Sequence, residues 1–162
     1  MTPGKLRAAM KALGFTDVLE VAIGADLCAT QEAIDFVNEV PDKIPFMGTS
    51  CCPAWSVMAK KMFPEYANCI SMALTPMTLT ARLIKNRNKD AKVVVIGPCA
   101  AKKLEAMRKD IRSDVDFVLT FDEMAGIFDA KHVALETTEA DPDGVTDAPE
   151  DGGYCAVRGG EH

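Results

Sequence analysis

No stretch of this 162-residue chain reaches the roughly 18 uninterrupted apolar residues that a membrane-spanning helix needs. The N-terminus has no apolar core of the kind that signal peptides carry. Basic residues do not cluster and the net charge is -6, so neither nucleic acid nor an anionic membrane is expected as a partner. A cytoplasmic location is the simplest expectation.

The cysteines are too scattered along the sequence to be the disulfide framework of a small disulfide-rich fold. There are six of them: Cys28, Cys51, Cys52, Cys69, Cys99 and Cys155. In a reducing cytosol, metal binding or catalysis explains clustered thiols better than disulfide formation does. Cys28 and Cys69 fit the pattern of buried, small hydrophobic residues better than that of ligands, and Cys155 lies in a Gly-rich tail.

Length and composition fit one domain, because 162 residues with 48% hydrophobic content can bury a real core. Helix and strand patterns alternate along the chain. Strands are expected at 17–22, 92–96 and 116–120, and helices at 2–14, 26–40, 55–62, from 75 onward, at 100–107 and at 121–129. This order predicts an α/β fold, a layered α/β lobe with a mostly parallel sheet flanked by helices. The lobe should span residues 1–135, and the acidic, Gly-rich tail at 136–162 should be flexible.

Residues 49–55 read TSCCPAW and follow a short apolar run at 44–47, which predicts a turn between a strand and a helix. Proline at the first helical position lacks the N–H that this position could not use. Cys51 and Cys52 therefore lie just ahead of a helix N-terminus, where unpaired N–H groups and the helix dipole favour a thiolate. This turn is a candidate site for a reactive or metal-binding sulfur.

A second turn of this kind follows the β-branched run at 92–96, where Gly97, Pro98 and Cys99 lead into a helix-forming segment. Parallel strands end at the same edge of a sheet, and ligands of open α/β sheets bind there. Both turns are therefore expected to place sulfur on one rim.

Three carboxylates, Glu32, Asp35 and Glu39, are spaced by three and four residues on the predicted helix at 26–40. The spacing alone favours a solvated acidic face. A proton-relay carboxylate is the alternative.

The two cysteine turns resemble motifs of the catalytic domain of iron-only, or [FeFe], hydrogenase large subunits. TSCCPAW at 49–55 is similar to the family motif T-S-C-C-P-x-W, and GPCAAKKLE at 97–105 is similar to M-P-C-x-x-K-x-x-E. The resemblance implies reversible reduction of protons to dihydrogen at the H-cluster, a [4Fe–4S] cluster bridged to a di-iron centre. It implies that Cys52 and Cys99 are metal ligands.

The resemblance also implies roles for the neighbouring residues. Cys51 would be the thiol that passes protons to the di-iron centre, and Lys102 would hold a cyanide ligand of that centre by a charge-assisted hydrogen bond. Ser50 and Pro98 would line the cofactor site.

A proton path to the surface is the remaining feature that the resemblance implies. Glu32, Asp35 and Ser71 fall where that path runs in the family. For Glu32 the resemblance favours the relay over the solvated face.

The chain departs from the family pattern at the third motif, E-x-M-A-C-x-x-G-C, which supplies two further cluster ligands. Glu123, Met124 and Ala125 match its opening, but Gly126 follows and no cysteine does. Gly97 replaces the usual methionine of the second motif, a change that is similar to a divergent, sensory-type branch. We therefore expect a fragment or truncated relative with an incomplete H-cluster site, inactive alone. Its expected partners are the remainder of the hydrogenase chain and a ferredoxin-type electron carrier, and two copies sharing one cluster is the alternative.

Two other functions remain open at this point. A non-catalytic relative that binds an iron–sulfur cluster for sensing or iron–sulfur assembly is the first, although an ordinary cluster needs neither Cys51 nor Lys102. A thiol redox protein is the second. It is disfavoured because adjacent cysteines form a strained ring, whereas redox pairs usually have two intervening residues.

Overall fold

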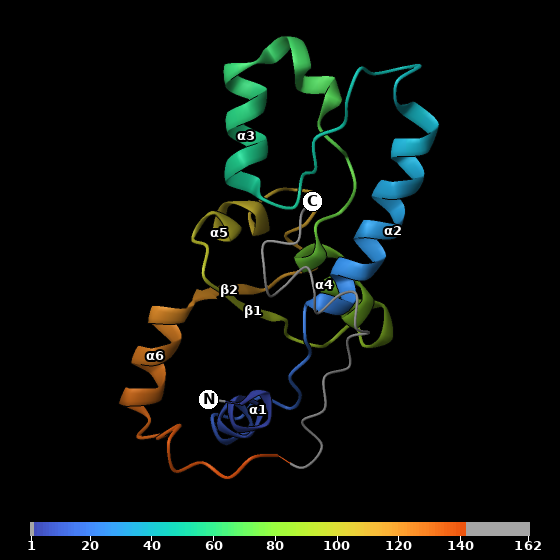
Figure 1. The fold of residues 1–162 in the computed structure, drawn as a ribbon. Coiled ribbons are helices and arrows are strands. Elements are labelled where there is room, and N and C mark those ends of the chain that lie inside the picture. The colour runs from blue at the N-terminus through green and yellow to red at the C-terminus, as the bar shows by residue number, and fades with distance from the viewer. Residues whose placement is uncertain (1, 142–162) are drawn as a thin grey trace.

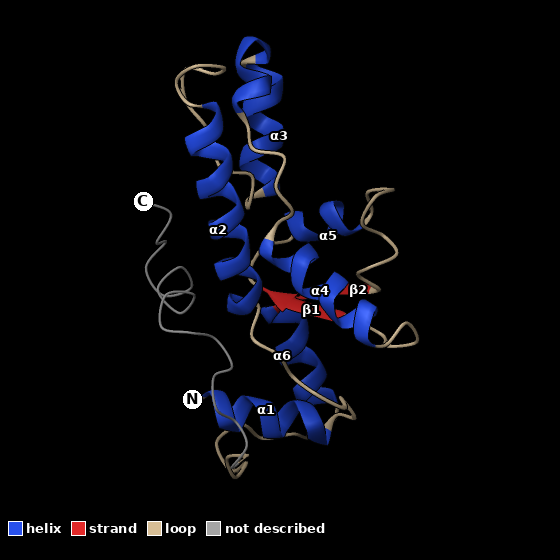
Figure 2. Cartoon of the chain, turned by 90° about the vertical axis from the view of Figure 1, so that its right-hand side faces the viewer, coloured by secondary structure: helices blue, strands red, loops and turns tan. Residues whose placement is uncertain are grey.

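The computed structural model describes residues 2–141 and contains a small parallel sheet surrounded by helices (Figure 1). In chain order the elements are α1 (Pro3–Ala12), α2 (Ala22–Glu39), α3 (Pro53–Met62), the 3₁₀ helix η1 (Pro64–Cys69), α4 (Pro76–Arg87), β1 (Val94–Gly97), α5 (Ala101–Ala106), β2 (Phe117–Thr120) and α6 (Phe121–Ala130). Helices α2 and α3 extend to one side of the sheet, whereas α1 and α6 lie on the other (Figures 1 and 2).

The helices begin where the sequence provides caps. Thr2 and Thr75 each cap a helix with a side-chain oxygen, and in α1, α3 and α4 proline occupies the first turn. At α6, Thr120 and Glu123 form a reciprocal capping box. Local signals therefore account for the starts of most helices that surround the sheet.

Strands β1 and β2 run parallel, with Val95 opposite Val118 and Ile96 opposite Leu119. Because side chains alternate along a strand, these two pairs face opposite sides of the sheet. The sheet is therefore covered on both faces, as parallel sheets generally are.

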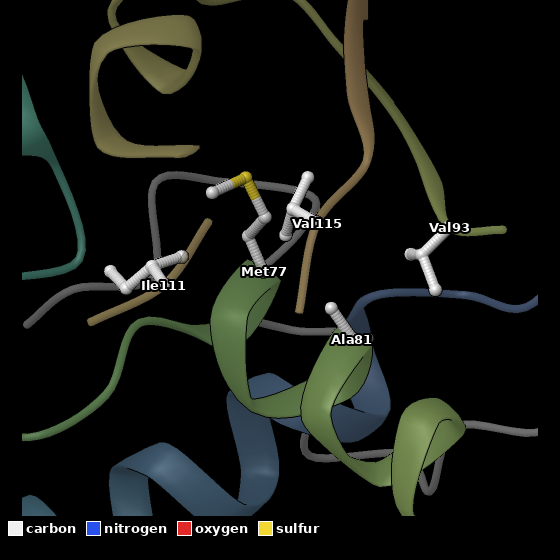
Figure 3. Close-up of a cluster of buried hydrophobic side chains, with 5 residues drawn as sticks. All are labelled: Met77, Ala81, Val93, Ile111 and Val115. Carbon is white, nitrogen blue, oxygen red and sulfur yellow. The ribbon is translucent and has the colours of Figure 1, made fainter. Parts of the chain in front are cut away.

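One core lies on the side of Val95 and Val118. It joins α4 to the segments that precede the two strands, and its buried members are Met77, Ala81, Val93, Ile111 and Val115 (Figure 3). The other core packs Ala9 and Met10 of α1 against Met124 and Phe128 of α6, together with partly buried Ile96. These two cores fix the sheet, whose β1 leads into the Cys99 turn.

Helices α2 and α4 cross at very close range, and Gly24 makes this possible. A Cβ atom at Gly24 would lie 2.2 Å from Thr80 Oγ1 and 2.4 Å from the carbonyl oxygen of Pro76. Only a residue without a side chain fits this crossing.

The α/β class with a parallel sheet is confirmed, but two expected strands are wrong. Residues 17–20 form no strand, and α2 begins at Ala22 instead of Asp26. Arg7 takes up the local polar groups instead: it donates to the carbonyl oxygen of Val18 and pairs with Asp17. The expected strand before the first cysteine turn is reduced to one bridge, between Gly48 and Ile70.

Most of the predicted tail, residues 142–162 with Cys155, lies outside the described residues. Its first part, up to Asp141, is joined to α1: the backbone N–H of Asp141 donates to the carbonyl of Gly4 at 3.0 Å, and its carboxylate pairs with Lys11 at 2.6 Å. In residues 2–141 no helix combines the length and apolar character needed to span a membrane.

Candidate functional site

The first cysteine turn caps helix α3. Cys52 is the N-cap residue, and its Sγ accepts a hydrogen bond from the backbone N–H of Trp55 at 3.4 Å. The indole N–H of Trp55 donates back to the carbonyl of Thr49 at 3.1 Å, which closes the turn. Cys51 and Cys52 are half-buried. The turn thus places the Cys52 sulfur at a helix N-terminus, a position that metal-binding and reactive cysteines often occupy.

The second cysteine turn follows β1 and precedes α5. Cys99 is half-buried and Pro98 is exposed, and the carbonyl of Cys99 accepts from the backbone N–H of Lys102 at 3.2 Å. The predicted strand, turn and helix around Cys99 are therefore confirmed.

Lys102 joins the two turns. Its ammonium donates to the backbone carbonyl of Cys51 at 2.6 Å and to Glu105 Oε2 at 3.0 Å. Helices α3 and α5, which follow the two turns, pack against each other. The structure thus brings together two cysteine segments that lie about fifty residues apart in the sequence. The predicted common rim of parallel strands is not the reason, because only an isolated bridge lies before the first turn in the described residues.

Glu105 is buried beneath this junction, with 2% of its surface exposed. Its Oε1 accepts hydrogen bonds from the hydroxyls of Thr75 and of Thr78, the latter at 3.2 Å. Thr75 is also the N-cap of α4. A buried carboxylate is costly unless it is paired and hydrogen-bonded, and here it is both.

Ser50 and Ser71 are connected through the backbone of Ala73. The hydroxyl of Ser50 donates to the carbonyl of Ala73 at 3.3 Å, and the N–H of Ala73 donates to Ser71 Oγ at 3.1 Å. The N–H of Ser71 in turn donates to the carbonyl of Gly48 at 2.8 Å. Ser71 is buried and lies beside the first cysteine turn, and its role in a proton path stays a prediction.

The acidic residues of α2 have contrasting surroundings. Glu32 is half-buried, and its Oε1 is buried without a hydrogen-bond partner among residues 2–141. Asp35 accepts from Gln31 Nε2 at 2.8 Å. The relay role of Glu32 stays a prediction. An orphaned buried oxygen nevertheless does not fit a simple solvated face.

Sequence reasoning missed the parts played by Glu105, Thr75 and Thr78. The sequence indicated Glu105 only as the last residue of the second motif, and Thr75 only as the start of a helix. The spacing of Lys102 and Glu105, three residues apart on a helix, is the signal that could have indicated their pairing. Nothing local to Thr75 indicates that it reaches Glu105.

The metal-binding capacity of the described residues is partial. Within residues 2–141, no three side chains of His, Cys, Asp or Glu gather into a metal site. What the two joined turns offer is a pair of half-buried thiols, Cys52 and Cys99. Lys102 bonds to both segments, through its ammonium to the Cys51 carbonyl and through its backbone N–H to the Cys99 carbonyl. This donor set fits half of the four thiolates that a [4Fe–4S] cluster takes. Buried Cys28 and Cys69 lie apart from this pair in the sequence and were not expected as ligands.

The family whose model matches the chain is described as iron only hydrogenase large subunit, C-terminal domain, and the match covers residues 1–162. Iron hydrogenase 1 of Clostridium pasteurianum is 36% identical over 155 residues, which cover 86% of this chain and 27% of that protein. The cytosolic Fe-S cluster assembly factor NAR1 of Candida dubliniensis is 30% identical over 110 residues, covering 63% of this chain and 19% of that protein.

The fold agrees with solved structures. An [FeFe]-hydrogenase from Chlamydomonas reinhardtii matches with a TM-score of 0.76 at 28% identity, over 91% of this chain and 42% of that one. The chain spans less than half the length of these relatives. The two cysteine motifs, the fold and the match along the whole sequence agree, and the chain belongs to the iron-only hydrogenase large-subunit family.

Proposed function

We propose that this chain forms part of an [FeFe] hydrogenase that reversibly reduces protons to dihydrogen, and that it carries part of the H-cluster site. The observation that carries the proposal is the hydrogen bond from Lys102 to the Cys51 carbonyl, which joins both cysteine motifs into one site. The family match and the iron–sulfur chemistry of the relatives support it.

In this proposal Cys52 and Cys99 are the two ligands that the chain gives to a [4Fe–4S] cluster. The Sγ of Cys52 lies at the start of α3, where it accepts a hydrogen bond from the backbone N–H of Trp55, and a metal would bind it as the thiolate. The remaining ligands come from the rest of the hydrogenase chain. Ser50 and Pro98, which lie next to the cysteines of the two motifs in the sequence, would line the cofactor.

The bound di-iron centre would supply the site at which protons and electrons combine. Cys51 acts next to it as the acid and base that delivers or removes the proton. Lys102 holds an anionic ligand of that centre through an N–H that neither Cys51 nor Glu105 occupies.

The proton reaches Cys51 through Ser71, Glu32 and Asp35. Two observations support this path: the position of Ser71 beside the first cysteine turn, and the buried, unpaired oxygen of Glu32. A carboxyl group that lies between the interior and the surface is a suitable proton carrier.

The proposed partners are the remainder of the hydrogenase chain and a ferredoxin-type electron carrier, in an anaerobic cytoplasm. A homodimer sharing one cluster is the alternative arrangement. Large apolar side chains on α2 and α3 are exposed and would be covered by either partner; they include Ile34, Val37, Val57 and Met62.

A non-catalytic iron–sulfur assembly or sensing protein is the second candidate, and the NAR1 match favours it. The two candidates differ in what Cys51 and Lys102 are for, because an ordinary cluster requires only its ligands.

Anaerobic reconstitution of the 162-residue chain tests how much of the site it carries. Because two thiolates leave a cluster with water-exposed irons, we expect iron and sulfide to be lost on gel filtration. The full-length protein, supplied with a di-iron centre, should keep the cluster and evolve dihydrogen from a reduced viologen dye. A full-length protein that keeps its cluster without any turnover would favour the assembly or sensing role.

A further inference from the structure

Glu105 has no role in the proposed chemistry, yet it is the least accessible charged side chain of the described site, and its whole carboxylate is engaged. Oε1 accepts from Thr75 and Thr78, and Oε2 accepts from Lys102. Thr78 is itself fully buried. Replacing a whole buried ion pair with apolar side chains of similar volume is often neutral for stability, so stability alone is a weak reason for keeping the Lys102–Glu105 pair.

The ammonium of Lys102 explains what the buried carboxylate can do. A lysine ammonium has three N–H donors on a flexible four-carbon stem. One donor is directed at the Cys51 carbonyl at 2.6 Å and a second at Glu105 at 3.0 Å. Two fixed partners leave the third N–H a single direction, whereas an ammonium with one partner could rotate.

The two threonines fix the carboxylate in turn. Thr75 begins α4 and is held there by its own capping bond from the N–H of Thr78 at 3.4 Å. Glu105 lies on α5, three residues after Lys102. The chain Thr75–Glu105–Lys102–Cys51 therefore ties the start of α4 to α5 and to the first cysteine turn.

We propose that Glu105, held by Thr75 and Thr78, is a positioning residue that orients the Lys102 ammonium so that its third N–H meets an anionic ligand of the cofactor. This inference rests on the proposed function for the identity of that ligand. The hydrogen bond by which Glu105 holds Lys102, called the clamp below, lies entirely within this chain and can be tested without any cofactor.

The matched variants are Glu105→Gln and Glu123→Gln. Glutamine at 105 keeps an oxygen for the two threonines but loses the charge that holds Lys102. Glu123 pairs with Lys103, the next residue of α5, in an exposed position, so its variant controls for the loss of one carboxylate near the site. Valine has nearly the same shape as threonine, so Thr78→Val removes one hydrogen-bond donor to Glu105 and keeps the charges of both Glu105 and Lys102.

The first measurement is the rate at which an amine-reactive ester modifies Lys102 in the 162-residue chain, followed by peptide mass spectrometry. Glu105→Gln should raise the Lys102 rate about tenfold, the factor expected for losing one charge-assisted hydrogen bond, with Thr78→Val intermediate. Glu123→Gln should leave the Lys102 rate unchanged. Circular dichroism confirms folding, and a folded Glu105→Gln chain with the wild-type rate would overturn the clamp.

The second measurement is the infrared spectrum of the cyanide ligands in the full-length protein carrying a di-iron centre. Glu105→Gln should shift or broaden the cyanide bands at unchanged iron content, and Glu123→Gln should not. Unchanged bands in a protein whose Lys102 has become reactive would overturn the orienting role while leaving the clamp intact. A protein that binds no di-iron centre would refute the proposed function, and the labelling result would stand separately.

Discussion

Replacing Asp116 with asparagine should destabilise the chain at neutral pH, and the cost should become smaller in acid. The Asp116 carboxylate accepts hydrogen bonds from Lys85 at 2.7 Å, from the backbone N–H of Val93 at 2.8 Å and from Lys92 at 3.1 Å. It therefore ties α4 and the residue before β1 to the start of β2. The hydrogen bond from Lys85 is the main cause that holds the pKa of Asp116 far below its usual value, against the opposing effect of desolvation.

The structure allows the magnitude to be estimated. The side chains of Asp116 and Lys85 are 18% and 15% exposed, whereas that of Lys92 is 76% exposed. A charge-assisted hydrogen bond contributes about 2 kcal/mol when it is shielded, and an exposed pair contributes about 0–1 kcal/mol. Asp116→Asn should therefore cost about 2 kcal/mol at pH 7, Lys85→Met a similar amount, and Lys92→Met much less.

The pH dependence follows from the sign of the shift. A carboxylate whose pKa is lowered by folding stabilises the protein fully above its unfolded pKa of about 3.9, and this stabilisation is lost as the pH falls toward the folded pKa. Urea unfolding followed by circular dichroism at pH 7, 5 and 2.5 measures it. The difference between wild type and Asp116→Asn should be the same at pH 7 and 5 and smaller at pH 2.5. A difference that stays constant down to pH 2.5, or an equal cost for Lys92→Met, would refute the reasoning.

Two further changes test the α2 contacts. In the full-length enzyme, Glu32→Gln keeps the size of the side chain but cannot carry a proton, so turnover should fall at least about tenfold, or about 1.4 kcal/mol in barrier, with iron content unchanged. Unchanged turnover would show that Glu32 carries no proton and belongs to a solvated acidic face of α2. Gly24→Ala should cost about 1–3 kcal/mol in urea unfolding, because its Cβ would overlap Thr80 and the Pro76 carbonyl. Gly126→Ala, where no atom lies within 4 Å of the new Cβ, should instead stabilise α6 by about 0.5–1 kcal/mol, and equal effects at the two glycines would contradict the close crossing.

The sequence predicts best where the determinants are local. The helices that begin after Thr2, Cys52 and Thr75 have a cap residue followed by proline, and all three are present. The β-branched run before Gly97 likewise forms the expected parallel strand. Both cysteine turns could be placed because the capped start of α3 follows the first and the strand β1 precedes the second.

Tertiary contacts decide the features that the sequence did not predict. Residues 17–20 have strand-like composition but no strand partner in the described part of the chain, and Arg7 binds their polar groups instead. The engagement of Glu105 by Thr75 depends on how α4 packs against α5, and no local pattern in the sequence encodes that distance. Long-range polar pairs of this kind cannot be predicted from a single sequence.

In the proposed function the adjacent cysteines of the first turn divide the chemistry, Cys52 as a cluster ligand and Cys51 as the proton carrier. Iron and sulfide content, measured together with dihydrogen evolution, tests this division most directly for Cys51→Ala and Cys52→Ala in the full-length protein. We expect that Cys51→Ala keeps the cluster and loses most turnover, since it removes a proton donor, whereas Cys52→Ala fails to retain the cluster. Loss of the cluster to the same extent in both variants would contradict it.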